Sequence, residues 1–324
     1  MNRLWYAIGV LLVLAGLVHL GVFVVDGGPW EGAVSWRKPF TFGVSFGLSV
    51  LTLTWVARFV RVRARAWLVG AFAVASTVEV TLISLQTWRG VPSHFNMETA
   101  FDTAVARSLA AGGGVLIAIA ITMTIAAFRP DPTPTNLSPT STPGPGPGPQ
   151  PNPDRWSDSR LNARSEPGLG LAPSMRLAVR AGFATLIVAV TFGGIMIARG
   201  VVEVMTGHQR LAYTVAVALK PAHAVFMHGV LLLPALAWLL AHTSLSEPQR
   251  LRMVRLATWT YVTSATAVSA LAVAGLTPVS ASTASVLCAG AISGLAIATL
   301  VLGRIQPAGQ QSPLGRRHHT GCRG

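Results

Sequence analysis

The strongest constraint on the fold of this chain is a series of eight long apolar stretches. A helix needs about 20 consecutive apolar residues to cross a membrane, and each stretch reaches that length. Apolar residues make up 51% of the sequence and charged residues only 11%, a balance that excludes an ordinary soluble domain. We therefore expect an all-α, polytopic membrane protein with eight transmembrane helices, over residues 5–25, 38–60, 66–88, 104–128, 175–199, 220–241, 253–276 and 281–302.

The first stretch has one feature of a signal peptide, because Arg3 precedes it. It is longer than a typical signal core, and no small-residue cleavage site stands before Asp26. We interpret it as a retained transmembrane helix.

The basic residues are unevenly distributed between the two ends of the predicted helices. A formal net charge of +14 would suit nucleic acid, but these residues flank apolar stretches and do not form one amphipathic face. We therefore expect the lipid bilayer, and no nucleic acid, as a partner. Most basic residues lie on the side that also carries both termini, so the positive-inside rule predicts cytoplasmic N- and C-termini.

A segment rich in proline, glycine and serine separates the predicted helices into two groups of four. Residues 1–128 form the first predicted half and residues 174–303 the second. Between them, residues 129–173 are expected to be a disordered cytoplasmic linker, and residues 304–324 a disordered basic tail. Each half has an even number of helices, so a duplication would give parallel repeats; the alternative is two unrelated halves.

Only two lysines occur in the chain, against twenty-three arginines, and both directly precede a proline. Lys38 and Lys220 each begin the second predicted helix of one half. A helix N-terminus carries partial positive charge, so a lysine beside it attracts anions. The alternative is a lysine whose side chain only extends to the membrane surface. The repeated placement favours a binding role.

Other polar groups add to this candidate site. Glu79 is the only acidic residue deep inside an apolar stretch, where an ionisable group is either functional or a structural carboxyl. The longest polar segment on the predicted outer side, residues 86–102, contains groups suited to ligand binding. The predicted ligand-binding residues are Lys38, Glu79, Arg89, His94, Asn96, Lys220 and His223.

The candidate ligands for haem or a metal ion are His19, His223 and His228. His223 and His228 are five residues apart, about 140° around a straight helix, so both cannot bind one metal without distortion. Cys288 and Cys322 form no paired-cysteine metal motif. No recognisable catalytic motif is present, so the sequence leaves open whether the protein is an enzyme.

Three short motifs resemble those of an uncharacterised family of bacterial polytopic integral membrane proteins. The motifs are Trp-Arg-Lys-Pro at residues 36–39, Arg-Gly-Val-Pro-Ser-His-Phe-Asn at residues 89–96, and Lys-Pro-Ala-His at residues 220–223 with Met-His-Gly at residues 227–229. The family has no assigned activity. The resemblance implies a multi-pass protein of the bacterial cytoplasmic (inner) membrane, and nothing about its chemistry.

These features lead to three functional hypotheses. The first is binding or transport of a small anionic solute through an outward-facing polar pocket. The second is a haem- or metal-binding membrane redox protein. The third is a non-catalytic sensor or accessory subunit whose linker docks a protein partner that the sequence does not identify.

Overall fold

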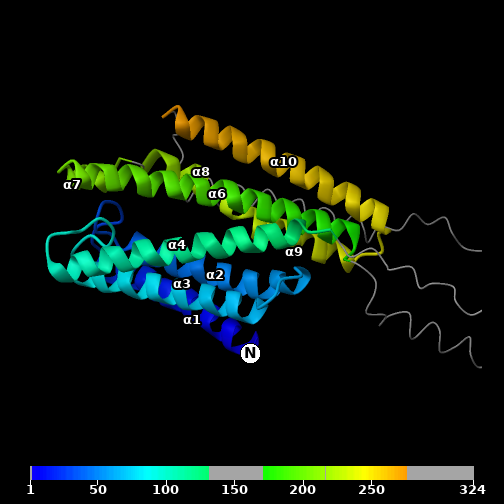
Figure 1. The fold of residues 1–324 in the computed structure, drawn as a ribbon, viewed down its shortest axis with the longest axis horizontal. Helices are drawn as coiled ribbons and strands as arrows, with labels where there is room; N and C mark the ends of the chain where they lie inside the picture. The colour runs from blue at the N-terminus through cyan, green and yellow to red at the C-terminus, as the bar shows by residue number, and fades with distance from the viewer. Residues whose placement is uncertain (1, 131–170, 216, 276–324) are drawn as a thin grey trace, which may run out of the picture.

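The protein is all-helical, without β-strands, over the residues that the computed structural model describes, which are 2–130, 171–215 and 217–275. Seven helical segments within these residues are long and apolar enough to cross a membrane. The eighth expected span, residues 281–302, lies outside the described residues, as do most of the linker and the whole tail. The elements are α1 (Asn2–Asp26), α2 (Arg37–Val56), η1 (Ala57–Phe59), α3 (Arg65–Trp88), α4 (Ala100–Phe128), α6 (Pro173–Met205), α7 (Gln209–Ala212), η2 (Val217–Leu219), α8 (Lys220–Met227), α9 (Gly229–Ala241) and α10 (Glu247–Val273) (Figure 1).

Helices α1 and α3 match their predicted spans to within a few residues, but three other helices are longer than the sequence indicated. Helix α4 begins one turn early, because the Thr99 side chain accepts a hydrogen bond from the backbone N–H of Asp102 (3.0 Å). Helix α10 begins more than a turn early, at a capping box formed by Ser246 and Gln249. Helix α6 continues more than one turn beyond its expected end. The predicted limits at residues 104, 199 and 253 are therefore wrong.

The predicted span over residues 220–241 lies within one segment long and apolar enough to cross a membrane, but it is not one continuous helix, because the chain breaks at His228 into α8 and α9. Pro234, inside α9, has no backbone N–H to donate to the carbonyl of Val230, which weakens the helix just after the break. At the break itself, Gly229 lies so close to α6 that a Cβ there would stand 3.0 Å from the Cβ of Thr185. Hydropathy alone does not reveal such an interruption.

The helices run along one common direction, up and down (Figure 1). In the first half, α1 packs mainly on α2, α2 also packs on α3, and α3 packs on α4. In the second half, α6 packs on α8, α9 and α10. The two halves meet where α4 contacts α6 and α2 contacts α9.

Each half contains a close helix crossing built from a pair of glycines. A Cβ placed on Gly9 of α1 would lie 3.0 Å from the carbonyl oxygen of Gly47 in α2. A Cβ placed on Gly182 of α6 would lie 3.0 Å from the carbonyl oxygen of Gly229 in α9. Small residues permit such approaches in membrane helices. The two crossings correspond in sequence as well, since Gly47 and Gly229 each stand nine residues after the lysine of their half.

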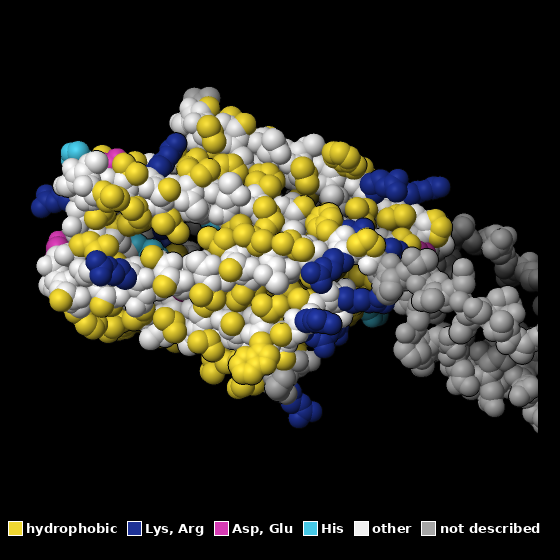
Figure 2. Space-filling model, viewed as in Figure 1, with side chains coloured by type: hydrophobic (Ala, Val, Ile, Leu, Met, Phe, Trp, Pro, Cys, Tyr) yellow, Lys and Arg dark blue, Asp and Glu magenta, His cyan; other side chains and the backbone are white. Residues whose placement is uncertain are grey.

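The two ends of the helix bundle differ in charge. Dark blue arginine side chains gather at the right of Figure 2, where α2, α4 and α9 finish and α3, α6 and α10 begin. We call this the arginine-rich end, and Glu247 is the only acidic residue that the structure describes there. The opposite end carries the connections over residues 27–36, 89–99 and 206–219, and we call it the loop end.

The halves share an apolar core towards the arginine-rich end. The largest buried cluster of the described residues joins Val56 of α2 and Met123 of α4 to Phe183 of α6 and Leu236 of α9, each at most 2% exposed. Each of the three smaller clusters belongs to one half alone. In the described structure, therefore, no apolar core joins the halves towards the loop end.

Candidate functional site

A polar recess lies between the two halves near the loop end. Figure 2 shows a hollow between α4 and α6, near the end that carries α7, with histidine side chains at its bottom. We call this recess the vestibule. Glu79, His94 and Lys220 all lie within electrostatic range of Lys38, and His223 follows Lys220 by one turn of α8. We assign these five predicted site residues to the vestibule.

The two lysines come from corresponding helix starts and lie within electrostatic range of each other. Lys38 is the second residue of α2 and Lys220 the first residue of α8. Lys38 is half-buried, whereas Lys220 is exposed and also interacts with the charges of Arg37 and Glu31. Because Glu31 already binds Arg37 at 2.8 Å, it adds little negative charge to the lysine pair.

Glu79 is the carboxyl group within electrostatic range of Lys38. It projects from the middle of α3, is only 3% exposed, and lies against α4 at the first of three consecutive glycines. A Cβ on Gly112 would stand 2.7 Å from Glu79 Oε1, and the backbone N–H of Gly113 donates a hydrogen bond to the carboxyl. One turn earlier on α3, the buried hydroxyl of Ser76 has no hydrogen-bond partner among the described residues.

His94 reaches the vestibule from the connection between α3 and α4. Its half-buried ring lies 5.9 Å from the ring of Phe42 in α2 and 6.3 Å from that of Phe95, measured between centroids. Burial, and then the positive charge of Lys38, hold the pKa of His94 well below its ordinary value of 6.5. At neutral pH the imidazole is therefore uncharged, and it can donate or accept a hydrogen bond.

His223 lies one turn after Lys220 on α8 and is half-buried. Its Nδ1 lies 2.7 Å from the carbonyl oxygen of Ala189 in α6, so Nδ1 carries the proton and donates it to that oxygen. The ring fits beside Gly193, where a Cβ would come within 3.1 Å of it. This tautomer leaves Nε2 as a hydrogen-bond acceptor.

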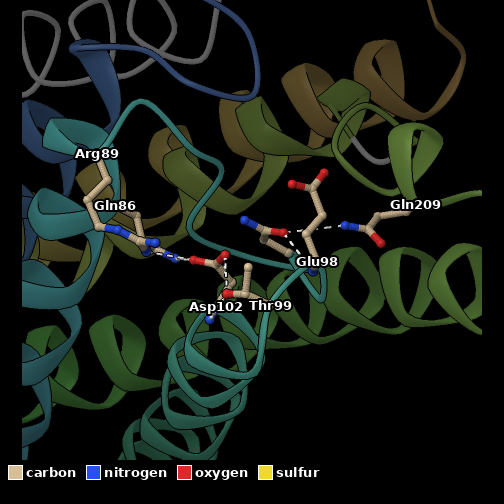
Figure 3. Close-up of polar contacts among 7 residues, drawn as sticks. Gln86, Arg89, Glu98, Thr99, Asp102 and Gln209 are labelled. Carbon is tan, nitrogen blue, oxygen red and sulfur yellow. Dashed lines mark hydrogen bonds and ion pairs between the residues drawn. The ribbon is translucent and has the colours of Figure 1, made fainter.

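Arg89, by contrast, is engaged in a closed polar network (Figure 3). Its guanidinium donates to Gln86 and, at 2.6 Å, to Asp102. Asp102 also accepts hydrogen bonds from Gln86 Nε2 (2.9 Å) and from the hydroxyl of Thr99 (2.6 Å). The network joins the end of α3 to the start of α4, so it fixes both ends of residues 89–99 and leaves Arg89 in a structural role.

Asn96 belongs to the same connection and is fully buried. Its Oδ1 accepts a hydrogen bond from the backbone N–H of Glu98 (3.1 Å) and one from Gln209 of α7 (3.5 Å) (Figure 3). Its Nδ2 has no hydrogen-bond partner among the described residues. The preceding residue, Phe95, has a positive φ of 63° and packs on Gly200 of α6. Residues 89–99 therefore extend from the first half to the second.

The remaining histidine candidates, His19 and His228, are engaged by hydrogen bonds of their own. His19 Nδ1 lies 2.7 Å from the carbonyl oxygen of Ala15, and Nε2 accepts a hydrogen bond from Trp88 (3.2 Å), so both ring nitrogens are used. His228 Nδ1 lies 2.6 Å from the carbonyl oxygen of Ala224 in its own helix. In the described parts of the chain, no three His, Cys, Asp or Glu side chains are grouped in a way that could hold a metal ion.

Sequence reasoning missed several residues that shape this region. Gln86 and Asp102 were visible as polar residues, but their pairing joins positions sixteen residues apart. The packing of Phe95 on Gly200 had no sequence signal. The three consecutive glycines at residues 112–114 could have indicated that α4 leaves space for a neighbouring side chain such as Glu79.

Comparisons of the chain with models of known protein families, with curated protein sequences and with solved structures found no match. The class of protein therefore follows from the fold itself. Large apolar side chains such as Leu11, Val18, Ile125 and Val202 are exposed on the long helices, a surface that lipid accommodates better than water. The architecture fits an integral membrane protein with several crossings.

Proposed function

We propose that the protein binds a small anionic solute in the vestibule and moves it across the membrane. The observation that carries this proposal is the approach of Lys38 and Lys220 to within electrostatic range of each other. Two like charges repel, and Glu79 supplies at most one compensating charge. An anion bound between the lysines would neutralise the remaining positive charge.

The position of the lysines supports the proposal, because carriers built from repeats bind their substrates where the repeats meet. The matching glycine crossings of α1 with α2 and of α6 with α9 favour a parallel duplication. In that arrangement Lys38 and Lys220 occupy equivalent places, one from each half. Residues 1–128 and 174–303 are the two halves of the proposed carrier, with an eighth helix over residues 281–302.

Each polar group of the vestibule has a proposed role. Lys38 and Lys220 attract the anion, with the positive ends of α2 and α8 adding to their field. His94 and His223 are neutral hydrogen-bonding contacts. Glu79 takes up or releases a proton as the Lys38 ammonium turns towards the bound anion. Arg89 and Asn96 hold residues 89–99 in place.

The charge difference between the ends supports an orientation. Basic residues face the cytoplasm in membrane proteins. We therefore place the arginine-rich end, and with it both termini, in the cytoplasm of a bacterial cell, and the vestibule on the outer side of the cytoplasmic membrane. The resemblance to the uncharacterised bacterial membrane family agrees with this placement.

The two rival hypotheses have less support. A haem or metal site would need free histidine nitrogens, but His19 uses both of its own, and His223 and His228 each retain one. A sensor or accessory subunit would act through the linker, whose residues 131–170 lie outside the described structure.

The experiment that tests the proposal is a binding measurement on the purified full-length protein in lipid nanodiscs. Chloride, phosphate, acetate and succinate would be added separately, and tryptophan fluorescence and thermal stability would be recorded. We expect at least one anion to bind, and Lys38→Gln and Lys220→Gln each to weaken it about tenfold, which corresponds to about 1.4 kcal/mol. Uptake of that anion into proteoliposomes would separate a carrier from a receptor.

Arg107→Gln is the matched control for the lysine variants. Arg107 is exposed on α4 towards the loop end, and its charge is not among those that act on Lys38, His94 or Lys220, so this substitution removes one positive charge from outside the lysine pair. Equal losses in all three variants would indicate a general charge effect. Binding that does not change in either lysine variant would refute the proposal.

A further inference from the structure

A second basic site lies at the arginine-rich end, far from the vestibule. A hollow of about 510 Å³ is lined there by Arg61, Val62, Arg63 and Arg129. These residues come from the turn between η1 and α3 and from the end of α4. Because residues distant in sequence contribute to one hollow, the arginines are gathered by the fold.

Neighbouring arginines contact aromatic rings or backbone carbonyls, whereas the arginine side chains lining the hollow have no such partner among the described residues. The Arg58 guanidinium lies over the rings of Trp55 and Phe59, at 5.2 and 4.9 Å from their centroids. Arg180 donates hydrogen bonds to the carbonyl oxygens of Ala127 (3.0 Å) and Arg129 (3.3 Å) and so caps the C-terminus of α4. Within the described residues, the three arginines of the hollow form no ion pair with a carboxylate.

The turn that presents two of these arginines is strained. Ala64, which directly follows Arg63 and precedes α3, has a φ of 57° and a ψ of 29°, in the left-handed region. A residue with a Cβ adopts this conformation at a cost of about 1 kcal/mol. The strained residue turns the chain from the segment that carries Arg61 and Arg63 into α3, and such strain often marks a functional segment.

Tryptophans place the hollow at the level of lipid headgroups. Trp55, Trp67 and Trp238 all lie within about a turn of the helix ends at the arginine-rich end, and Trp67 is 82% exposed. Tryptophan side chains gather where the membrane core meets water. The hollow lies just beyond this aromatic layer along α2 and α3, which is the depth of phospholipid phosphates.

We infer that the hollow binds the phosphodiester headgroup of an anionic phospholipid. Arginine pairs with phosphate oxygens through two parallel hydrogen bonds, and three arginines exceed the single charge of one phosphodiester. Basic pockets at the cytoplasmic ends of transmembrane helices recognise anionic headgroups in this way. A lipid is favoured over a free phosphate ion because Val62 adds an apolar wall and the hollow opens at headgroup depth. The bound lipid joins the α2–α3 turn to the end of α4.

The test compares the full-length protein in nanodiscs of phosphatidylcholine alone with nanodiscs that contain phosphatidylglycerol as well. We expect phosphatidylglycerol to raise the melting temperature by about 3–5 °C. The double variant Arg61→Gln/Arg63→Gln should lose that gain and should retain less phosphatidylglycerol in native mass spectrometry. A separate sample in phosphatidylcholine with added inorganic phosphate distinguishes a lipid from a free anion.

The matched control is Arg252→Gln/Arg255→Gln, which removes the same charge from exposed positions on α10 at the same end. This control should keep the full effect of phosphatidylglycerol. Equal losses in both double variants would show a diffuse charge effect and overturn the site. The inference would also fail if phosphatidylglycerol gave no gain, or if inorganic phosphate alone reproduced it.

Discussion

The carboxyl group of Glu79 in α3 lies directly against Gly112 in α4, so that a Cβ on Gly112 would stand 2.7 Å from Oε1. The missing side chain is what leaves room for a buried acid between two membrane helices. The next residue, Gly113, supplies a backbone N–H to the same carboxyl. The position of Glu79 therefore depends on the small residues of α4 as much as on its own helix.

Gly112→Ala should displace the Glu79 carboxyl and destabilise the protein. The added methyl overpacks this contact, and because Oε1 is the end of a flexible side chain that can turn aside, we expect a cost at the low end of the usual range, about 1 kcal/mol. We expect a lower melting temperature in nanodiscs, together with weaker anion binding if Glu79 acts in the vestibule. Differential scanning fluorimetry measures the first effect.

Gly113→Ala and Gly114→Ala are matched controls for that substitution. A Cβ at either position meets no described atom within 4 Å. Alanine also favours a helix over glycine by about 0.5–1 kcal/mol, so both controls should be at least as stable as the wild type. If Gly112→Ala behaves like its two neighbours, the close contact with Glu79 is not present.

Gly200→Ala should release residues 89–99 from α6. A Cβ on Gly200 would lie 2.7 Å from Cε2 of Phe95, so the ring must move, and we expect a loss of about 1–3 kcal/mol. The same substitution in a Phe95→Ala background should cost much less, because the clashing ring is gone. Chemical denaturation of the wild type, the two single variants and the double variant gives the coupling free energy between Gly200 and Phe95. Purely additive effects on the free energy of unfolding would contradict the contact.

Loss of the Asp102 carboxylate should lower the melting temperature by several degrees. Asp102→Ala removes the acceptor for Gln86, Arg89 and Thr99 at once and leaves the Arg89 cation without a carboxylate partner. Glu31→Ala breaks another described ion pair near the loop end, the one with Arg37, but Glu31 is 70% exposed, so its loss should change little. A similar small effect in both variants would show that the Asp102 network is not needed to hold residues 89–99.

Stability should fall as the pH drops below about 6.5, and His94 should account for part of that loss. The unfolded chain binds a proton at His94 near its ordinary pKa of 6.5, whereas the folded protein does so only well below it. The contribution is therefore complete above the unfolded pKa and decreases as the pH falls towards the folded pKa. Each unit of difference between the two pKa values corresponds to about 1.4 kcal/mol.

The measurement is the melting temperature between about pH 7.5 and about pH 5, for the wild type and His94→Asn. The variant should show a shallower decrease with falling pH. A wild-type slope in His94→Asn would mean that the imidazole is not desolvated.

The existence and approximate length of the described helices could be predicted from the sequence, because hydropathy is a local property. The spans of α1 and α3 differ from expectation by only a few residues, and each of the other described spans also contains a helix. The errors occur where contacts outside the apolar pattern decide the backbone. Thr99 and Ser246 cap helices before their apolar runs begin, and the helix breaks at His228, beside Gly229 and Pro234, inside a run that hydropathy predicts as one span.

The candidate site was only partly predictable. Lys38, Lys220 and Glu79 stood out because charged side chains are rare in apolar stretches, and the fold brings them into electrostatic range. Arg89 was predicted from the polar segment over residues 86–102, but it pairs with Asp102, thirteen residues later. The sequence pattern does not distinguish a basic side chain that faces a recess from one that anchors a loop. The two differ only in whether a carboxylate from another part of the chain pairs with the basic group.

The sequence by itself determined the all-helical, membrane-spanning character of the chain and the uneven charge of its ends. Both follow from transfer free energies that each segment contributes independently. Only the tertiary structure decided which helices cross closely, where the halves share an apolar core, and that a polar recess lies between them near the loop end. Those features depend on fits such as Gly9 with Gly47, Gly182 with Gly229 and Phe95 with Gly200, which exist only once distant segments pack together.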